Sequence, residues 1–99
     1  MKEQVIVVGL GRFGSSVARE VEALGHEVLA TDIDEEVVNE VAPDVTHAVQ
    51  VDASAEGALA SIGAGDVSTA IVGITGNTEA SIFATMALQT LGVRTIAKA

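Results

Sequence analysis

Three glycines near the start of the chain, Gly9, Gly11 and Gly14, have the spacing G-x-G-x-x-G. They follow an uncharged apolar run at residues 5–8 and precede a segment, residues 17–24, with apolar residues at helical spacing. A strand, a glycine turn and a helix in this order leave backbone N–H groups at the helix N-terminus free to bind phosphate. We expect Gly9 to permit the tight turn, Gly11 to let a diphosphate approach the backbone, and Gly14 to let the helix pack closely on the strand.

A carboxylate lies where this chemistry needs one. A second strand is predicted over residues 27–32 and ends in Asp32, 18 residues after Gly14. A carboxylate about 20 residues beyond the glycines can accept hydrogen bonds from the ribose hydroxyls of an adenine nucleotide. Because the same charge repels a 2′-phosphate, the pattern predicts ATP, ADP or NAD(H) as the ligand and not NADP.

Composition narrows the class of protein. The chain has 99 residues, enough for one domain, and a formal net charge of −9, which argues against binding to nucleic acid. No apolar run approaches the roughly 20 residues of a membrane-spanning helix, so direct membrane insertion is not expected. Cysteine is absent, which excludes disulfides and thiolate chemistry, and no metal site is predicted.

The predicted strands that position the glycines and Asp32 alternate with predicted helices along the chain. Further strands are predicted at residues 47–51, 70–74 and 95–98, and helical segments lie between them. Asp34 is expected to cap the second helix and Pro43 to end it; the third helix should begin at Ser54 or Ala55, and the fourth at Asn77 or Thr78. This alternation predicts an α/β, Rossmann-like three-layer fold with a parallel sheet of order 3-2-1-4-5.

The chain stops after the fifth strand, before the sixth strand and crossover helix that complete many such folds. We therefore expect either association at an open edge strand or a longer protein of which residues 1–99 are one nucleotide-binding domain.

Ligands of parallel α/β sheets bind outside the carboxyl ends of the strands, which selects the candidate residues. The predicted cofactor-binding residues are Gly9, Gly11, Arg12, Phe13, Gly14, Asp32, Ile33, Asp52, Ala53, Thr75, Gly76, Asn77 and Lys98. His26 and His47 belong to the opposite end of the sheet, so neither is expected to act as an acid or base. No catalytic residue is predicted.

Several of these residues have an alternative role. Arg12 either caps the turn in solvent or donates to a terminal phosphate, of its own or a neighbouring subunit. Asp52 either forms a turn or lies beside the adenine, and Asn77 either caps a helix or contacts the ligand. Lys98 is either an exposed edge lysine or a positive charge near the ligand. Phe13, although inside the motif, is also expected to contribute to the core.

Three segments carry a resemblance to a known family: residues 8–14 (Val-Gly-Leu-Gly-Arg-Phe-Gly), residues 25–34, and residues 46–49 leading to 52–54. Together they resemble the RCK or KTN domain, the TrkA N-terminal family, and the first is most similar to Ktr-type regulatory subunits. The resemblance implies a cytoplasmic, nucleotide-sensing domain that is not an enzyme. It also implies binding of ATP, ADP, NAD or NADH, self-association into dimers and rings, and gating of a membrane-embedded potassium-translocating subunit from the inner face of the membrane.

By position, the resemblance implies that the three glycines hold phosphates, that Asp32 holds the ribose, and that Asp52 and Ala53 lie near the adenine. It places Arg12 at the terminal phosphate of ATP and matches Lys98 with a basic residue near the end of the fifth strand. The residues themselves leave one alternative open, the cofactor-binding half of an NAD-dependent dehydrogenase. A methyltransferase fits less well, because a methyl donor without phosphates does not need Gly14.

Overall fold

The computed structural model describes residues 2–98 and contains one five-stranded parallel sheet flanked by helices. Its strands are β1 (Gln4–Val8), β2 (Glu27–Asp32), β3 (His47–Gln50), β4 (Thr69–Val72) and β5 (Arg94–Ala97). Its α-helices are α1 (Arg12–Ala23), α2 (Glu35–Val41), α3 (Ala58–Ser61) and α4 (Thr78–Thr90), and short 3-10 turns η1 (Ala42–Asp44) and η2 (Ala64–Asp66) follow α2 and α3. The strand order is β3-β2-β1-β4-β5, which confirms the predicted order and fold class.

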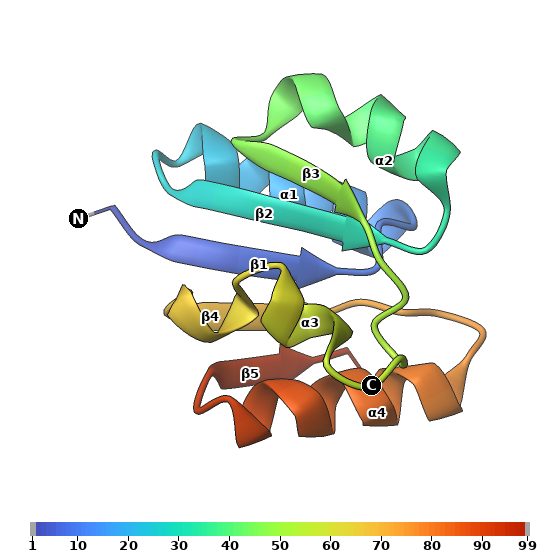
Figure 1. The fold of residues 1–99 in the computed structure, drawn as a ribbon. Helices are drawn as coiled ribbons and strands as arrows, with labels where there is room; N and C mark the ends of the chain where they lie inside the picture. Colours follow the sequence, from blue (N-terminus) through green and yellow to red (C-terminus); the bar gives the residue numbers. More distant parts are fainter. Residues whose placement is uncertain (1, 99) are drawn as a thin grey trace.

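The helices cover both faces of the sheet and form the two outer layers (Figure 1). Strand β1 is central, and successive residues of this strand point to opposite faces. Ile6 and Val8 belong to one core cluster, with Leu59 of α3 and Leu88 of α4. Val5 and Val7 of β1 belong to the other cluster, on the side of α1 and α2. Both faces of the sheet are therefore packed, as the continuous apolar strands predict.

Two of the predicted helix caps are present. The Oδ1 atom of Asp34 accepts a hydrogen bond of 3.0 Å from the backbone N–H of Glu36, at the start of α2. The Oδ1 atom of Asn77 accepts one of 3.0 Å from the N–H of Ala80, at the start of α4. Each side chain satisfies an N–H group that the first helical turn leaves without a partner.

The third helix differs from its prediction. It begins at Ala58 and not at Ser54 or Ala55, because the preceding residues form a turn. The Oδ1 atom of Asp52 accepts hydrogen bonds from the backbone N–H of Ser54 (3.0 Å) and from its hydroxyl (2.6 Å). Gly57 then adopts a left-handed conformation with φ of 73°, which reverses the chain before the helix. The turn that Asp52 stabilises therefore forms here, although the spacing of the apolar residues is typical of a helix.

Candidate functional site

A cavity of about 490 Å³ opens at the carboxyl ends of the strands, where β1 and β4 part toward opposite sides of the sheet. Of the predicted site residues, it is lined by Gly9, Gly11, Asp32, Ile33, Asp52, Ala53, Thr75 and Asn77. It is also lined by residues that the prediction left out: Val8, Asp34, Val37, Val51, Ser54, Gly73, Ile74 and Ala80. The sequence therefore located the cavity correctly, and the extra residues come mainly from the loops that follow β2, β3 and β4.

Two of the motif glycines are required by the backbone itself. Gly9 has φ of 96°, and a Cβ atom there would lie 2.8 Å from the backbone nitrogen of Ile74. A Cβ atom on Gly14 would overlap the carbonyl oxygen of Gly9, because α1 packs directly on the turn. Gly14 is buried and does not line the cavity, so its role is to bring the helix close to the strand.

Gly11, the middle glycine of the motif, is not required by the backbone conformation. Gly11 has φ of −66° and ψ of −162°, an extended conformation that any residue can adopt. A Cβ atom on Gly11 would meet only the Oγ1 atom of Thr75, at 3.7 Å, which is an ordinary contact. The fold does not require a glycine here, yet the Cβ would point into space that borders the cavity. The absence of a side chain leaves the backbone of Gly11 accessible from the cavity.

The N-terminus of α1 is not capped by any side chain, in contrast to α2 and α4. The first helical turn also carries no acidic residue, so the positive end of the helix dipole is not compensated. The Oγ atom of Ser15 donates to the carbonyl oxygen of Gly11 at 2.7 Å, which does not use the N–H groups of this turn. Together with open space at Gly11, this is an arrangement that binds anions.

Asp32 lies half-buried at the end of β2 and holds two backbone segments. Its Oδ2 atom accepts a hydrogen bond of 2.7 Å from the N–H of Leu10, and its Oδ1 atom accepts one of 2.9 Å from the N–H of Asp34. Each carboxylate oxygen has a second lone pair, so the side chain can accept ribose hydroxyls as well.

The other acids of the cavity are exposed. Asp52 lies beyond the end of β3, and hydrogen bonds from the Ser54 hydroxyl and backbone N–H hold the pKa of its carboxyl below the usual range. Asp34 adds a third carboxylate to the lining. The three carboxylates make the cavity electronegative on the side of β2 and β3.

Gly76 and Lys98 do not line this cavity. They line a neighbouring hollow of about 410 Å³, which shares Ile74, Thr75 and Asn77 with the first. The ammonium group of Lys98 lies 5.4 Å from the centre of the Phe13 ring, a cation–π distance.

The two remaining predicted residues lie outside both hollows. Arg12 is exposed at the first turn of α1. Phe13 packs its ring beside Gly73, since a Cβ on that glycine would be 3.1 Å from the ring. Its side chain is 39% exposed, so the prediction that it belongs to the core is wrong. The residue follows the start of α1 and faces the end of β5, where the sheet has its edge.

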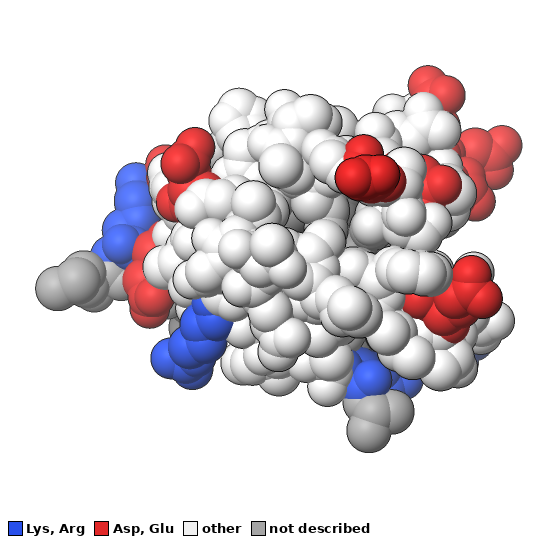
Figure 2. All heavy atoms as spheres, turned by 60° about the horizontal axis from the view of Figure 1, so that its bottom comes forward, with Lys and Arg blue, Asp and Glu red and all other residues white. Residues whose placement is uncertain are grey.

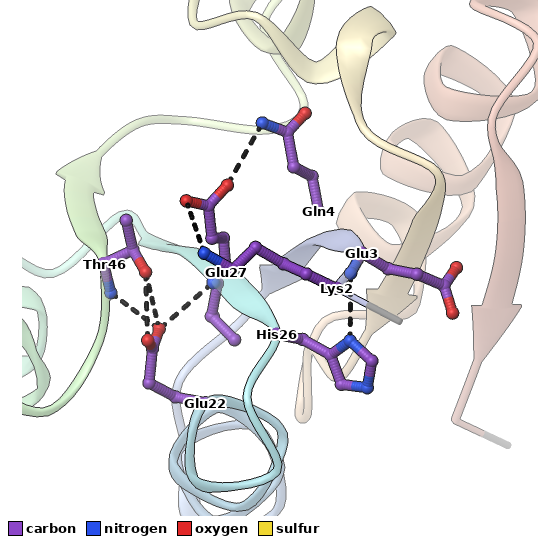
Figure 3. Close-up of polar contacts among 8 residues, drawn as sticks. Lys2, Glu3, Gln4, Glu22, His26, Glu27 and Thr46 are labelled. Atoms are coloured by element: carbon purple, nitrogen blue, oxygen red, sulfur yellow. Dashed lines mark hydrogen bonds and ion pairs between the residues drawn. The ribbon is translucent and has the colours of Figure 1, made fainter.

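The opposite end of the sheet holds both histidines, and the polar contacts at this end include His26 (Figure 3). The Nδ1 atom of His26 accepts a hydrogen bond of 3.0 Å from the N–H of Glu3, and His47 begins β3. Both lie at the amino ends of strands, which confirms that they are remote from the cavity. Glu22 of α1 accepts hydrogen bonds from the N–H groups of Val28 (3.1 Å) and Thr46 (2.7 Å).

Among residues 2–98, no group of three or more His, Cys, Asp or Glu side chains is placed to hold a metal ion. No helix in this range is both long enough and apolar enough to cross a membrane.

Sequence comparison relates the chain to a known family. The family model described as the TrkA-N domain matches residues 5–99. The chain is 45% identical over 96 residues to the Ktr system potassium uptake protein C of Bacillus subtilis, covering 97% of this chain and 43% of that protein. It is 45% identical over 94 residues to the Ktr system potassium uptake protein A of the same bacterium, covering 95% and 42%. The chain thus spans less than half the length of these relatives.

Structure comparison supports the fold. The NAD(P)-binding domain of an exopolyphosphatase-related protein from Archaeoglobus fulgidus has a TM-score of 0.83 and 26% identity, over 98% of this chain and 73% of that one. The Kef CTD of Shewanella denitrificans in AMP-bound form has a TM-score of 0.78 and 21% identity, over 97% of this chain and 58% of that one. The second likeness shows the fold alone.

Proposed function

The chain belongs to the TrkA-N domain family, and from that premise we propose that it is a nucleotide-sensing regulatory domain of a potassium uptake system or channel. Its ligand would be ATP, ADP or NAD(H). It would act at the cytoplasmic face of the membrane on a membrane-embedded potassium-translocating subunit, and it would associate with further copies of itself. The 45% identity to two Ktr system potassium uptake proteins supports this assignment.

The observation that carries the nucleotide proposal is the contrast among the three glycines. The backbone demands glycine at positions 9 and 14 but not at position 11, and a ligand group close to the cavity wall would account for the glycine there. A diphosphate on the uncapped first turn of α1 would use this space and the positive end of the helix dipole. The adjacent Thr75 hydroxyl and Asn77 amide would contribute hydrogen bonds to phosphate or ribose.

The sugar and base would occupy the electronegative side of the cavity. Asp32 would accept the ribose hydroxyls, and Asp52 and Ala53 would lie beside the adenine, with Ile33 on the rim. Three carboxylates line the cavity, so a 2′-phosphate would be repelled and NADP should bind poorly.

Two basic side chains, Arg12 and Lys98, would interact with the part of the ligand beyond the diphosphate. Arg12 is outside the cavity of its own chain, so we assign it to the terminal phosphate of a nucleotide held by a neighbouring subunit. Lys98, in the adjoining hollow beside Gly76, would contribute a positive charge within the same chain.

Such a domain would regulate by binding, without chemistry of its own. A nucleotide shifts an equilibrium between two subunit arrangements only when it binds one of them more tightly. A cofactor-binding half of a dehydrogenase is the alternative, and the likeness to an NAD(P)-binding domain is compatible with it. Against it, the titratable side chains that line the cavity are aspartates, and a hydride-transfer acid or base of another kind is not among the lining residues.

Isothermal titration calorimetry with ATP, ADP, NAD, NADH, NADP and S-adenosylmethionine tests the proposal. We expect binding of adenine nucleotides or NAD(H), much weaker binding of NADP, and none of S-adenosylmethionine. A cavity that binds none of the adenosine phosphates or NAD(H) would overturn the nucleotide-sensing function. Turnover of NADH with small oxo-acids would support the dehydrogenase instead.

A further inference from the structure

Ile33 is an exposed apolar side chain among acidic residues. It follows directly after β2, is 63% exposed and lines the cavity. The exposed apolar side chains of α4 belong to a broad surface without charged groups, which Figure 2 shows with α4 turned forward. Ile33 differs from them, because its neighbours in the chain are Asp32, Asp34 and Glu35. This side chain is therefore part of the cavity wall and not of an apolar surface patch.

Gln50, the last residue of β3, holds the backbone of Ile33. Its Nε2 atom donates a hydrogen bond of 3.0 Å to the carbonyl oxygen of Ile33, although the two residues are 17 positions apart in the chain. Gln50 is exposed and is not among the residues that line the cavity. An effect of this amide on a ligand must therefore pass through the segment that the amide holds.

Three further hydrogen bonds fix the residues on either side of Ile33. The N–H of Val51 donates to the carbonyl oxygen of Asp32 at 3.0 Å. The N–H of Asp34 donates to the Oδ1 atom of Asp32 at 2.9 Å, and the side chain of Asp34 caps α2. Ile33 lies between these fixed points, and the Gln50 amide ties its own carbonyl oxygen to the end of β3.

Apolar side chains from three parts of the chain line the cavity on the side of β2 and β3. They are Ile33 after β2, Val37 of α2, and Val51 and Ala53 after β3. Ile33 is exposed, whereas the other three are half-buried. A base that covers apolar surface gains affinity in proportion to the area that it removes from water, so Ile33 is the side chain of this group with most to contribute.

We propose that Gln50 is a positioning residue for the base of the nucleotide: its amide fixes the backbone of Ile33 so that the Ile33 side chain forms one wall of the base site. The inference rests on the proposed nucleotide-sensing function and adds to it a residue outside the cavity. A wall that is already fixed loses less conformational freedom on binding than a wall that the ligand must order. Loss of the amide should therefore lower affinity although no group that touches the nucleotide is removed.

The first measurement needs no nucleotide. Amide hydrogen exchange of the 99-residue chain, followed by NMR spectroscopy, reports how firmly the segment after β2 is held. We expect the N–H of Asp34 to exchange about three times faster or more in Gln50→Leu than in the wild type, the effect of losing one neutral hydrogen bond. Gln4→Leu is the control, because it makes the same change at an exposed position at the opposite end of the sheet. Equal exchange in the wild type and in Gln50→Leu would overturn the positioning role.

The second measurement is a double-mutant cycle on ADP affinity, followed by calorimetry. Gln50→Leu should weaken ADP binding by about three- to tenfold, and Ile33→Ala should weaken it by at least as much, whereas Gln4→Leu should bind like the wild type. In the Ile33→Ala background, Gln50→Leu should have almost no further effect, because no large side chain remains to be positioned. Wild-type affinity in either single variant, or losses that add in the double variant, would overturn the proposal.

These outcomes separate the role of Gln50 from the nucleotide-sensing function. A wild type that binds ADP, together with a Gln50→Leu variant that binds it equally well, would overturn the role of Gln50 and leave the function standing. A wild type that does not bind ADP would overturn the role of Gln50, and the proposed function would fall with it if ATP and NAD(H) also did not bind.

Discussion

The Oδ2 atom of Asp32 accepts a 2.7 Å hydrogen bond from the backbone N–H of Leu10, so the carboxylate that ends β2 holds the glycine loop at the end of β1. Its Oδ1 atom accepts a second bond from the N–H of Asp34. The same side chain lines the cavity. A residue proposed to hold the ribose thus also organises the loop proposed to hold the phosphates, and its substitution should affect both stability and binding.

We expect Asp32→Ala to weaken adenine-nucleotide binding by about 10- to 150-fold, the equivalent of one hydrogen bond to a charged group, about 1.5–3 kcal/mol. The free energy of unfolding should also fall by about 1–3 kcal/mol, because the N–H of Leu10 loses its partner. Calorimetry and urea denaturation measure the two effects. Asp44→Ala is the control, since Asp44 forms a surface ion pair with Arg19 and its loss should leave binding unchanged. Wild-type affinity in Asp32→Ala would contradict the ribose role.

The Gly11→Ala variant tests whether a side chain at position 11 affects nucleotide binding without affecting the stability of the fold. Its Cβ would meet only Thr75 at 3.7 Å, so the free energy of unfolding should stay within about 0.5 kcal/mol of the wild type. The same methyl group would occupy the space proposed for the diphosphate, so we expect nucleotide affinity to fall by at least tenfold. The measurements are urea denaturation and calorimetry with ADP.

Gly14→Ala is the matched comparison for that experiment, because it adds the same methyl group three residues later. There the Cβ would overlap the carbonyl oxygen of Gly9, so this variant should be destabilised by several kcal/mol or fail to fold. A stable Gly11→Ala protein that binds ADP like the wild type would leave the middle glycine without a ligand-based explanation.

Arg12 allows a test of nucleotide discrimination. If its guanidinium binds a terminal phosphate, Arg12→Ala should weaken ATP binding while leaving ADP binding nearly unchanged. The difference between the affinities for ATP and ADP should therefore become smaller. The effect should appear only at concentrations where the chain self-associates, because Arg12 lies outside the cavity of its own chain. Arg19→Ala, on the same helix, is the control. Equal losses of ATP and ADP affinity would argue against a role at the third phosphate.

The sequence was sufficient to predict the order of the strands. Most of the strands contain a short apolar run, and two of them are followed by a helix-capping residue, Asp34 after β2 and Asn77 after β4. These local signals agree with the tertiary structure. At Asp52 they do not, because its side chain stabilises a turn that delays α3 to Ala58. Helical spacing alone cannot show which of two competing local structures is more stable.

The site was predicted less completely than the fold. The rule that ligands bind at the carboxyl ends of parallel strands selected Asp32 and Thr75, which line the cavity. Gly73 was missed because β4 was predicted to extend to Ile74, whereas the strand ends at Val72. The exposure of Phe13 was missed for another reason. An aromatic residue in an apolar motif is usually buried, and only the tertiary structure places its ring at the sheet edge beside Lys98.

The carboxylate of Glu22 accepts several of the hydrogen bonds at the amino ends of the strands (Figure 3). It joins the end of α1 to the start of β2, through Val28, and to the segment before β3, through Thr46. Partial burial alone would raise the pKa of Glu22. The hydrogen bonds from the Thr46 hydroxyl and from the two backbone N–H groups outweigh burial, so the pKa lies below its ordinary value of 4.5.

This shift predicts how stability depends on pH. A carboxyl whose pKa is lower in the folded state stabilises the fold above its unfolded pKa, and the contribution is lost as pH falls through the folded value. We therefore expect Glu22→Gln to reduce the free energy of unfolding at pH 7 and to differ less from the wild type as pH falls below about 4.5. Urea denaturation across this range, with exposed Glu20→Gln on the same helix as the control, measures the difference. A gap between Glu22→Gln and the wild type that does not shrink in acid would show that the charge of Glu22 contributes nothing to the network.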